Sequence, residues 1–79
     1  MPPDLLERLY DEHAPSLFRY LHGILLNEHD VRDVLQETFI SVTKSRPPDS
    51  LKAERTWMFR IAHNAAIDHI RRNRTRERY

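Results

Sequence analysis

Apolar residues recur at spacings of three and four in three separate segments of the chain. These segments cover residues 4 to about 25, 31 to about 45, and 51 or 52 to about 72, and the spacing is that of helices with one buried side. The pattern predicts an all-α fold, a compact bundle of three main helices in a single domain. Its expected core consists of Leu9, Leu17, Leu21, Val31, Val34, Leu35, Val42, Met58, Ile61 and Ala65.

The first segment follows two prolines and contains a third. Asp4 is the expected N-cap of its helix. Pro15 interrupts the pattern, and the apolar stripe after it is rotated from the stripe before it. The segment is therefore either one helix kinked at Pro15 or two abutting helices.

The second segment separates its faces cleanly, with Asp30 as its expected N-cap. Its core side carries Val31, Val34, Leu35, Thr38 and Val42, with Phe39 at the border. Its opposite side carries Asp33, Gln36, Glu37, Ile40 and Lys44. Ile40 is the exception on that polar face. It is either a tolerated exposed residue or the apolar centre of an interface with a polar rim.

The stretch Arg46 to Ser50, RPPDS, cannot continue a helix, because its prolines remove donors and restrict the residue before them. Ser50 is the expected N-cap of the third helix. That helix buries Met58, Ile61, Ala62 and Ala65. Its other side carries a stripe made of Arg60, His63, Asn64, Ile67 and Arg71. The stripe suits a polyanion, although it could also be an ordinary solvated face.

Composition adds one asymmetry to this picture. The 79 residues include no cysteine and one glycine, so a small domain must fold by packing alone, without disulfides or thiolate-bound zinc. The net charge is only +1. However, residues 1 to 50 carry nine acids and five bases, whereas residues 51 to 79 carry three acids and eight bases. This polarity indicates a protein partner for the acidic part and a polyanion for the basic part.

Several functions are not expected from the sequence. The spacing of the five histidines fits no metal site, and no nucleophile has a paired base, so we expect neither an enzyme nor a cofactor. Asp68 lies four residues before Arg72, which predicts an ordinary intrahelical ion pair. With no long apolar run and no signal-peptide pattern at the N-terminus, we expect no membrane segment and a cytoplasmic protein.

Two motifs in order resemble the N-terminal conserved domain, region 2, of an extracytoplasmic-function (ECF) sigma factor of bacterial RNA polymerase. They are DVLQETF at Asp33 to Phe39 and WMFRIAHNAAIDHIRR at Trp57 to Arg72. YDEHAPSLFRYLHGILL resembles the leading helix of the same family, so the resemblance covers nearly the whole chain. It implies a transcription initiation specificity factor, with core RNA polymerase, promoter DNA and an anti-sigma factor as partners.

The resemblance also implies roles for particular residues. Asp33, Gln36, Glu37 and Ile40 would dock on the clamp helices of the β′ subunit. The loop Arg46 to Lys52, with Arg46, Asp49, Ser50 and Lys52, would hold a base flipped out of the non-template strand. Arg60, His63, Asn64, Arg71, Arg72 and the arginines that follow would face DNA at the minus-ten element. Trp57 and Asp68 are ranked as mainly structural.

The chain departs from the family pattern in a few places. Thr43 stands where the family often has an aromatic residue, and the loop has two prolines where many members have a glycine. The expected domain core covers about residues 4 to 72. The resemblance implies that residues 73 to 79 form a basic tail leading to a C-terminal helix-turn-helix domain, which is expected to be missing from this chain. The alternative function is a protein-interaction module of the same fold, an adaptor or a decoy bound by an anti-sigma factor, without a DNA function.

Overall fold

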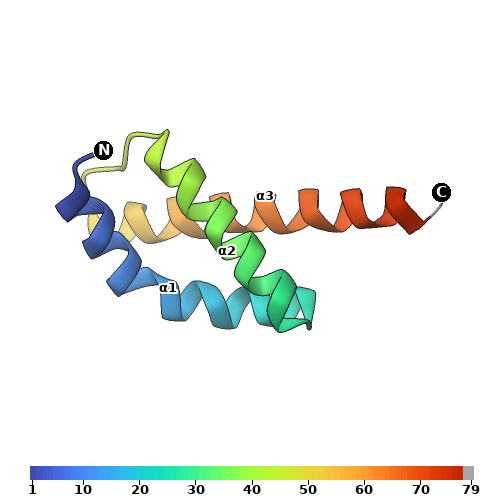
Figure 1. Ribbon diagram of the computed structural model, residues 1–79. Helices are drawn as coiled ribbons and strands as arrows, with labels where there is room; N and C mark the ends of the chain where they lie inside the picture. Colours follow the sequence, from blue (N-terminus) through green and yellow to red (C-terminus); the bar gives the residue numbers. More distant parts are fainter. Residues whose placement is uncertain (78–79) are drawn as a thin grey trace.

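Three helices make up the domain in a computed structural model that describes residues 1–77, with side chains to residue 74. They are α1 (Pro3–Leu25), α2 (Glu28–Thr43) and α3 (Leu51–Glu77), and each packs against both others. Figure 1 shows α2 lying across α1 and α3, with the C-terminal part of α3 projecting beyond the other two. The predicted all-α bundle is confirmed. No helix within the described part of the chain is both long and apolar enough to cross a membrane.

The first helix is continuous, with Pro15 inside it. It bends in the region of Pro15 (Figure 1), so the kinked alternative is confirmed over two separate helices. A proline has no N–H to donate and its ring crowds the preceding turn, which accounts for the bend. The predicted cap is wrong. Pro2 occupies the N-cap position without a side-chain hydrogen bond, and Asp4 lies in the first turn.

The starts of α2 and α3 are fixed by side-chain caps. The Asn27 side-chain oxygen accepts hydrogen bonds from the backbone N–H groups of His29 and Asp30, at 2.9 and 3.3 Å. Asn27 is therefore the N-cap of α2, and the prediction of Asp30 is wrong, because the helix begins one turn earlier than the apolar pattern suggests. At α3 the prediction is confirmed. The Ser50 hydroxyl oxygen accepts from the Ala53 N–H at 3.1 Å.

The core contains eight of the ten predicted residues. Ile61 and Ala65 are only partly buried, whereas Ala62, which was also predicted on the buried side, and Ala66 are fully buried. Small residues at these positions let α3 lie close to its neighbours. Thr38 is also fully buried, and its hydroxyl donates to the Val34 carbonyl oxygen at 2.7 Å, so no buried donor is left unpaired there.

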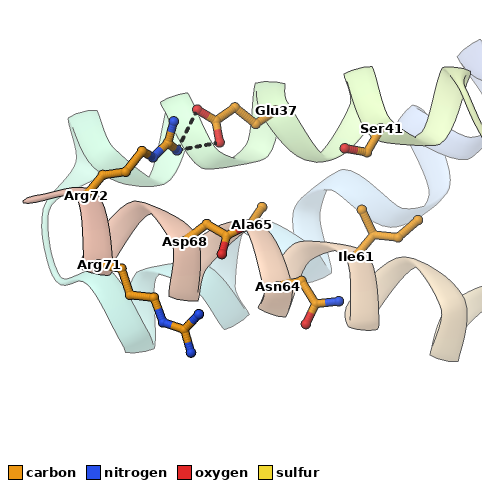
Figure 2. Close-up of a pocket in the computed structure, with 8 residues that line it drawn as sticks. All are labelled: Glu37, Ser41, Ile61, Asn64, Ala65, Asp68, Arg71 and Arg72. Carbon is orange, nitrogen blue, oxygen red and sulfur yellow. Dashed lines mark hydrogen bonds and ion pairs between the residues drawn. The ribbon is translucent and has the colours of Figure 1, made fainter.

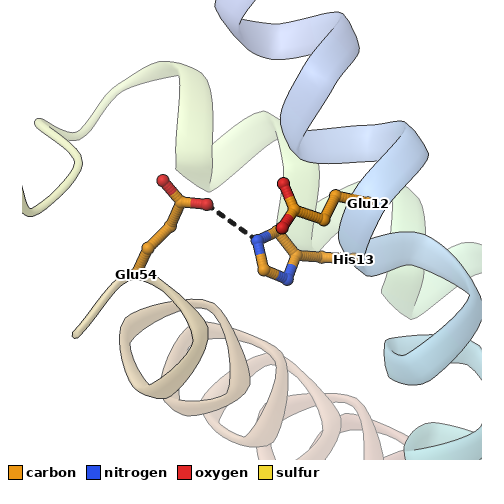
Figure 3. A group of neighbouring side chains, drawn as sticks. All are labelled: Glu12, His13 and Glu54. Atoms are coloured by element: carbon orange, nitrogen blue, oxygen red, sulfur yellow. Dashed lines mark hydrogen bonds and ion pairs between the residues drawn. The ribbon is translucent and has the colours of Figure 1, made fainter. Parts of the chain in front are cut away.

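A buried carboxylate joins the start of α3 to the N-terminal half of α1, a contact that the sequence pattern does not predict. Glu54, in the first turn of α3, is 4% exposed. It accepts hydrogen bonds from two α1 residues: from the Arg8 guanidinium at 2.9 Å and from the Nε2 of buried His13 at 2.8 Å. Figure 3 shows the bond between His13 and Glu54. Position in the first turn also favours a negative charge, because the helix dipole is positive there. None of these three residues was predicted to be structural.

This network shifts the pKa of its members. Hydrogen bonds from Arg8 are the main reason that the pKa of Glu54 lies below its usual value; burial acts in the opposite direction, and the hydrogen bond from His13 adds to the lowering. The same hydrogen bonds to Glu54 raise the pKa of Arg8. Glu54 therefore stabilises the fold when ionised. That contribution is lost as pH falls through the lowered pKa of the folded state.

We expect Glu54→Gln to lower the free energy of unfolding at neutral pH by about 2 kcal/mol, because it weakens the charge-assisted bond to Arg8 and leaves His13 poorly paired. The variant should also lose part of the acid sensitivity of the wild type. Urea unfolding at several pH values measures both effects. Glu12→Gln is the control, since Glu12 is an exposed partner of Arg8 and its loss should change stability by less than about 0.5 kcal/mol. Equal losses in the two variants would contradict the assignment.

Candidate functional site

The outer face of α2 brings together the residues predicted to bind a protein. Asp33, Gln36 and Ile40 are exposed, Glu37 is half-buried, and all four line one shallow groove. Ile40 is 49% exposed, a large apolar surface between polar neighbours. The other side of this groove comes from α3, through His69, Arg72 and Asn73. We call this groove the acidic groove.

A second groove of about 590 Å³ runs between α2 and α3 (Figure 2). It contains three residues of the predicted nucleic-acid set, Asn64, Arg71 and Arg72. We call it the amide groove, after Asn64. Its other lining residues are Glu37, Ser41, Ile61, Ala65 and Asp68. Ser41 was not singled out from the sequence, because a serine on an exposed helix face gives no pattern.

One ion pair forms the ridge that the two grooves share. The Arg72 Nη2 lies 3.1 Å from each carboxylate oxygen of Glu37. Glu37 belongs to the predicted protein-binding set and Arg72 to the predicted DNA-binding set. The prediction that Arg72 pairs with Asp68 is wrong. Among the described residues Asp68 has no hydrogen-bond or ion-pair partner, and it lines the amide groove.

The polar stripe predicted along α3 is divided between two sides of the helix. The Nδ1 of His63 lies 2.8 Å from the hydroxyl of Tyr20, which turns this histidine toward α1. The Tyr20 ring also packs edge-on against Phe59, with centroids 5.2 Å apart. Asn64, the next residue, faces the opposite side, toward α2. The sequence spacing is correct, but a stripe this wide spans the contacts to two neighbouring helices.

Beside the loop between α2 and α3 lies a third hollow, which we call the loop hollow. It is about 510 Å³ and is lined by Pro48, Ser50, Lys52, Ala53, Thr56, Trp57 and Arg60. Three predicted DNA-binding residues thus meet here, Ser50, Lys52 and Arg60. Trp57 also lines the hollow, and it packs against the core as well. Its place on the helix face had ranked it as mainly structural. The two other loop residues, Arg46 and Asp49, are exposed and do not line the hollow.

The described residues also contain one group with the composition of a metal site. Ligand atoms of Glu12, His13 and Glu54 lie within 4.8 Å of one another. The Arg8 guanidinium, however, bonds to both carboxylates, at 2.8 Å to Glu12 and 2.9 Å to Glu54. A cation would have to displace it, so we interpret the group as structural. Sequence spacing could not reveal it, because Glu54 is 41 residues from His13.

Comparison with known proteins identifies the family of the chain. Residues 9–76 match the family Sigma-70 region 2. The chain is 35% identical over 74 residues to the ECF RNA polymerase sigma factor SigL of Mycobacterium tuberculosis, and 30% identical over 73 residues to SigX of Bacillus subtilis. Each alignment covers 91% of this chain but only 42% and 38% of the relative, so the chain spans less than half of their length. No solved structure matches the chain significantly.

For the loop hollow, we expect Ser50→Ala to destabilise the domain by about 1 kcal/mol, because the Ala53 N–H loses its cap. Ser50→Asp should retain wild-type stability, since aspartate caps equally well. Thermal unfolding followed by circular dichroism measures both. Ser45→Ala is the control, because the Ser45 hydroxyl donates to the Ser41 carbonyl oxygen and caps no helix start. A Ser50→Ala variant as stable as the control would show that the cap contributes nothing.

Proposed function

Because the chain belongs to the Sigma-70 region 2 family, we propose that it binds core RNA polymerase and recognises and opens the minus-ten element of bacterial promoters. One observation carries the proposal. Two grooves of different chemistry, the acidic groove and the amide groove, lie on either side of the Glu37–Arg72 pair. The domain can thus hold a protein and a nucleic acid at the same time, on adjacent surfaces. It performs no covalent chemistry and acts in the bacterial cytoplasm, where the polymerase works.

The acidic groove is the proposed polymerase surface. Ile40 provides an exposed apolar anchor, and Asp33 and Gln36 surround it with polar groups. Interfaces commonly combine such an anchor with a polar rim that excludes water. The clamp helices of β′ are the proposed partner, and a basic side chain there would find carboxylates within reach. An anti-sigma factor that covers Ile40 would block the same surface.

The amide groove and the loop hollow form the proposed DNA surface. Asn64 is a short side chain on a rigid helix, and its amide both donates and accepts, which suits a base edge. In the loop hollow, the Trp57 ring lies near the cations Lys52 and Arg60. An aromatic ring beside cations favours a single-stranded base held by stacking, with its phosphate neutralised nearby. Strand opening would then be stabilised by capturing the unpaired base.

The polymerase surface makes one prediction. Gln36→Ala should weaken binding to core polymerase by about 1 kcal/mol and Ile40→Asp by more, because both lie at the centre of the proposed interface. Pull-down with a β′ clamp-helix fragment, with helicity checked by circular dichroism, measures the effect. Leu26→Asp is the matched control, since Leu26 is 77% exposed but lies in the α1–α2 turn. Wild-type binding by both Gln36→Ala and Ile40→Asp would exclude this face.

A second prediction separates reading from positioning on α3. Arg71→Ala should weaken binding of the polymerase complex to all promoters about equally and make the salt dependence shallower by roughly one unit, as expected for one lost phosphate contact. Asn64→Ala should leave that slope nearly unchanged and alter the preference among minus-ten sequences. Affinities across a small set of minus-ten variants at several salt concentrations decide between them.

The exposed Arg19, on α1, provides the control for this experiment. Arg19→Ala should leave both slope and preference unchanged. If Asn64→Ala gives a uniform loss and a shallower slope, Asn64 is a backbone contact instead. If none of the variants changes DNA binding while polymerase binding persists, the domain is a protein-interaction module.

A further inference from the structure

Two carboxylates, those of Glu37 and Asp68, are candidate ion-pair partners of Arg72, and Arg72 pairs with Glu37. Its guanidinium bonds to Glu37 across the groove on α2, at 3.1 Å to both oxygens. Asp68 lies four residues earlier on the same helix, and an acid placed four residues before a base is the favourable order for a helical ion pair. In Figure 2 the Asp68 side chain stands between Arg72 and Asn64, and no interaction joins it to another residue drawn. Both side chains of the observed pair are exposed enough to move, at 57% for Arg72 and 42% for Glu37.

These observations, together with the function proposed above, point to an exchange of partners. We infer that Arg72 switches from Glu37 to Asp68 when a cation of the polymerase engages Glu37, and that Asp68 is thereby a control residue of the DNA surface. In the free chain, the negative charge of Asp68 lies in the amide groove with Asn64 and Arg71, and no hydrogen bond or ion pair joins the Asp68 carboxylate to another described residue. After the exchange, Arg72 neutralises that charge.

The consequence is a coupling between the two partners. A DNA phosphate entering the amide groove of the free chain meets the Asp68 charge, whereas Arg72 is bound to Glu37. Once Glu37 is engaged by the polymerase, Arg72 pairs with Asp68 and the repulsion of the phosphate by Asp68 falls. By linkage, DNA bound in the groove must favour polymerase binding by the same factor. For an exposed ion pair that factor is small, roughly 1.5- to 5-fold.

The exchange can be tested without polymerase or DNA. Glu37→Gln removes the charged partner on α2, so Arg72 should move to Asp68 and shift the NMR resonance of the Asp68 carboxyl carbon at neutral pH. In a chain that also carries Arg72→Gln, the shift should disappear. Glu28→Gln is the matched control. It removes one carboxylate of α2 and breaks an ion pair, with Arg32, of 2.8 Å. An Asp68 resonance that is the same in wild type and Glu37→Gln would overturn the inference.

The functional arm uses a short oligothymidine as the probe, because phosphate contacts do not depend on sequence. Glu37→Gln should raise the affinity of the free chain for it by roughly 1.5- to 5-fold. In the Arg72→Gln background the gain should be smaller, because only the repulsion by the Glu37 charge itself, which also lines the groove, is removed. At physiological salt the Glu28→Gln control should change little, because Glu28 does not line the amide groove and lies roughly 13 Å along α2 from Glu37, beyond the screening distance of about 8 Å. An equal gain in Glu28→Gln, or a gain that is undiminished without Arg72, overturns the coupling.

The two arms also separate this inference from the proposed function. If no variant and not even the wild type binds the oligothymidine, the DNA function fails, and the carbon resonance alone still decides whether Arg72 changes partner. If DNA binds but the resonance does not move, the function stands and the exchange is wrong.

Discussion

The buried charge of Glu54 is the constraint on which the bundle depends. Helix α3 is joined to α2 by the residues 44–50, and packing of small residues such as Ala62 lets it lie close to its neighbours. Its register against α1, however, is set by a carboxylate that can be buried only with Arg8 and His13 in place. An uncompensated carboxylate in that position would cost more than most single apolar contacts contribute. This contact therefore acts with the buried stripe of Met58, Ala62 and Ala66 to orient the side chains of α3.

That register matters because the proposed working residues all lie on α3 or opposite it. Along this one helix, Arg60 lines the loop hollow, Asn64 lines the amide groove, and Arg72 forms part of the ridge between the two grooves. A rotation of α3 about its axis would move all three together. Small domains of this kind can thus present several contacts with few mobile parts. The Glu37–Arg72 pair is different, since it is exposed and can be exchanged.

Much of the fold could be predicted from periodicity, and the errors have physical causes. The faces of α2 were correct because its apolar and polar residues separate by the helical period. On α3, Ile61 and Ala65 were predicted in the core but are only partly buried, whereas Ala66 is fully buried, because hydrophobicity does not reveal how closely helices approach. The Asn27 cap was missed because a helix can begin in a polar turn, before its apolar pattern starts.

The functional residues were less predictable, since their partners are distant in sequence. Asp68 and Arg72 satisfy the local rule for an ion pair, yet Glu37, 35 residues away, takes the arginine. His63 belongs to a polar stripe by spacing, but Tyr20 of α1 holds it on another side. Local spacing therefore predicts which polar residues can take part in contacts between helices. Which of them meet depends on the packing of the helices.

The stiffness of the α2–α3 connection has an entropic consequence. Pro47 and Pro48 are half-buried in a connection of only seven residues, and each has its φ angle restricted by its ring. Few conformations are therefore lost when a ligand settles against this segment, and little of the binding free energy is consumed in ordering it. The same rigidity limits adaptation. A ligand of the wrong shape would clash with this rigid segment, so selectivity here would arise from steric exclusion as much as from favourable contacts.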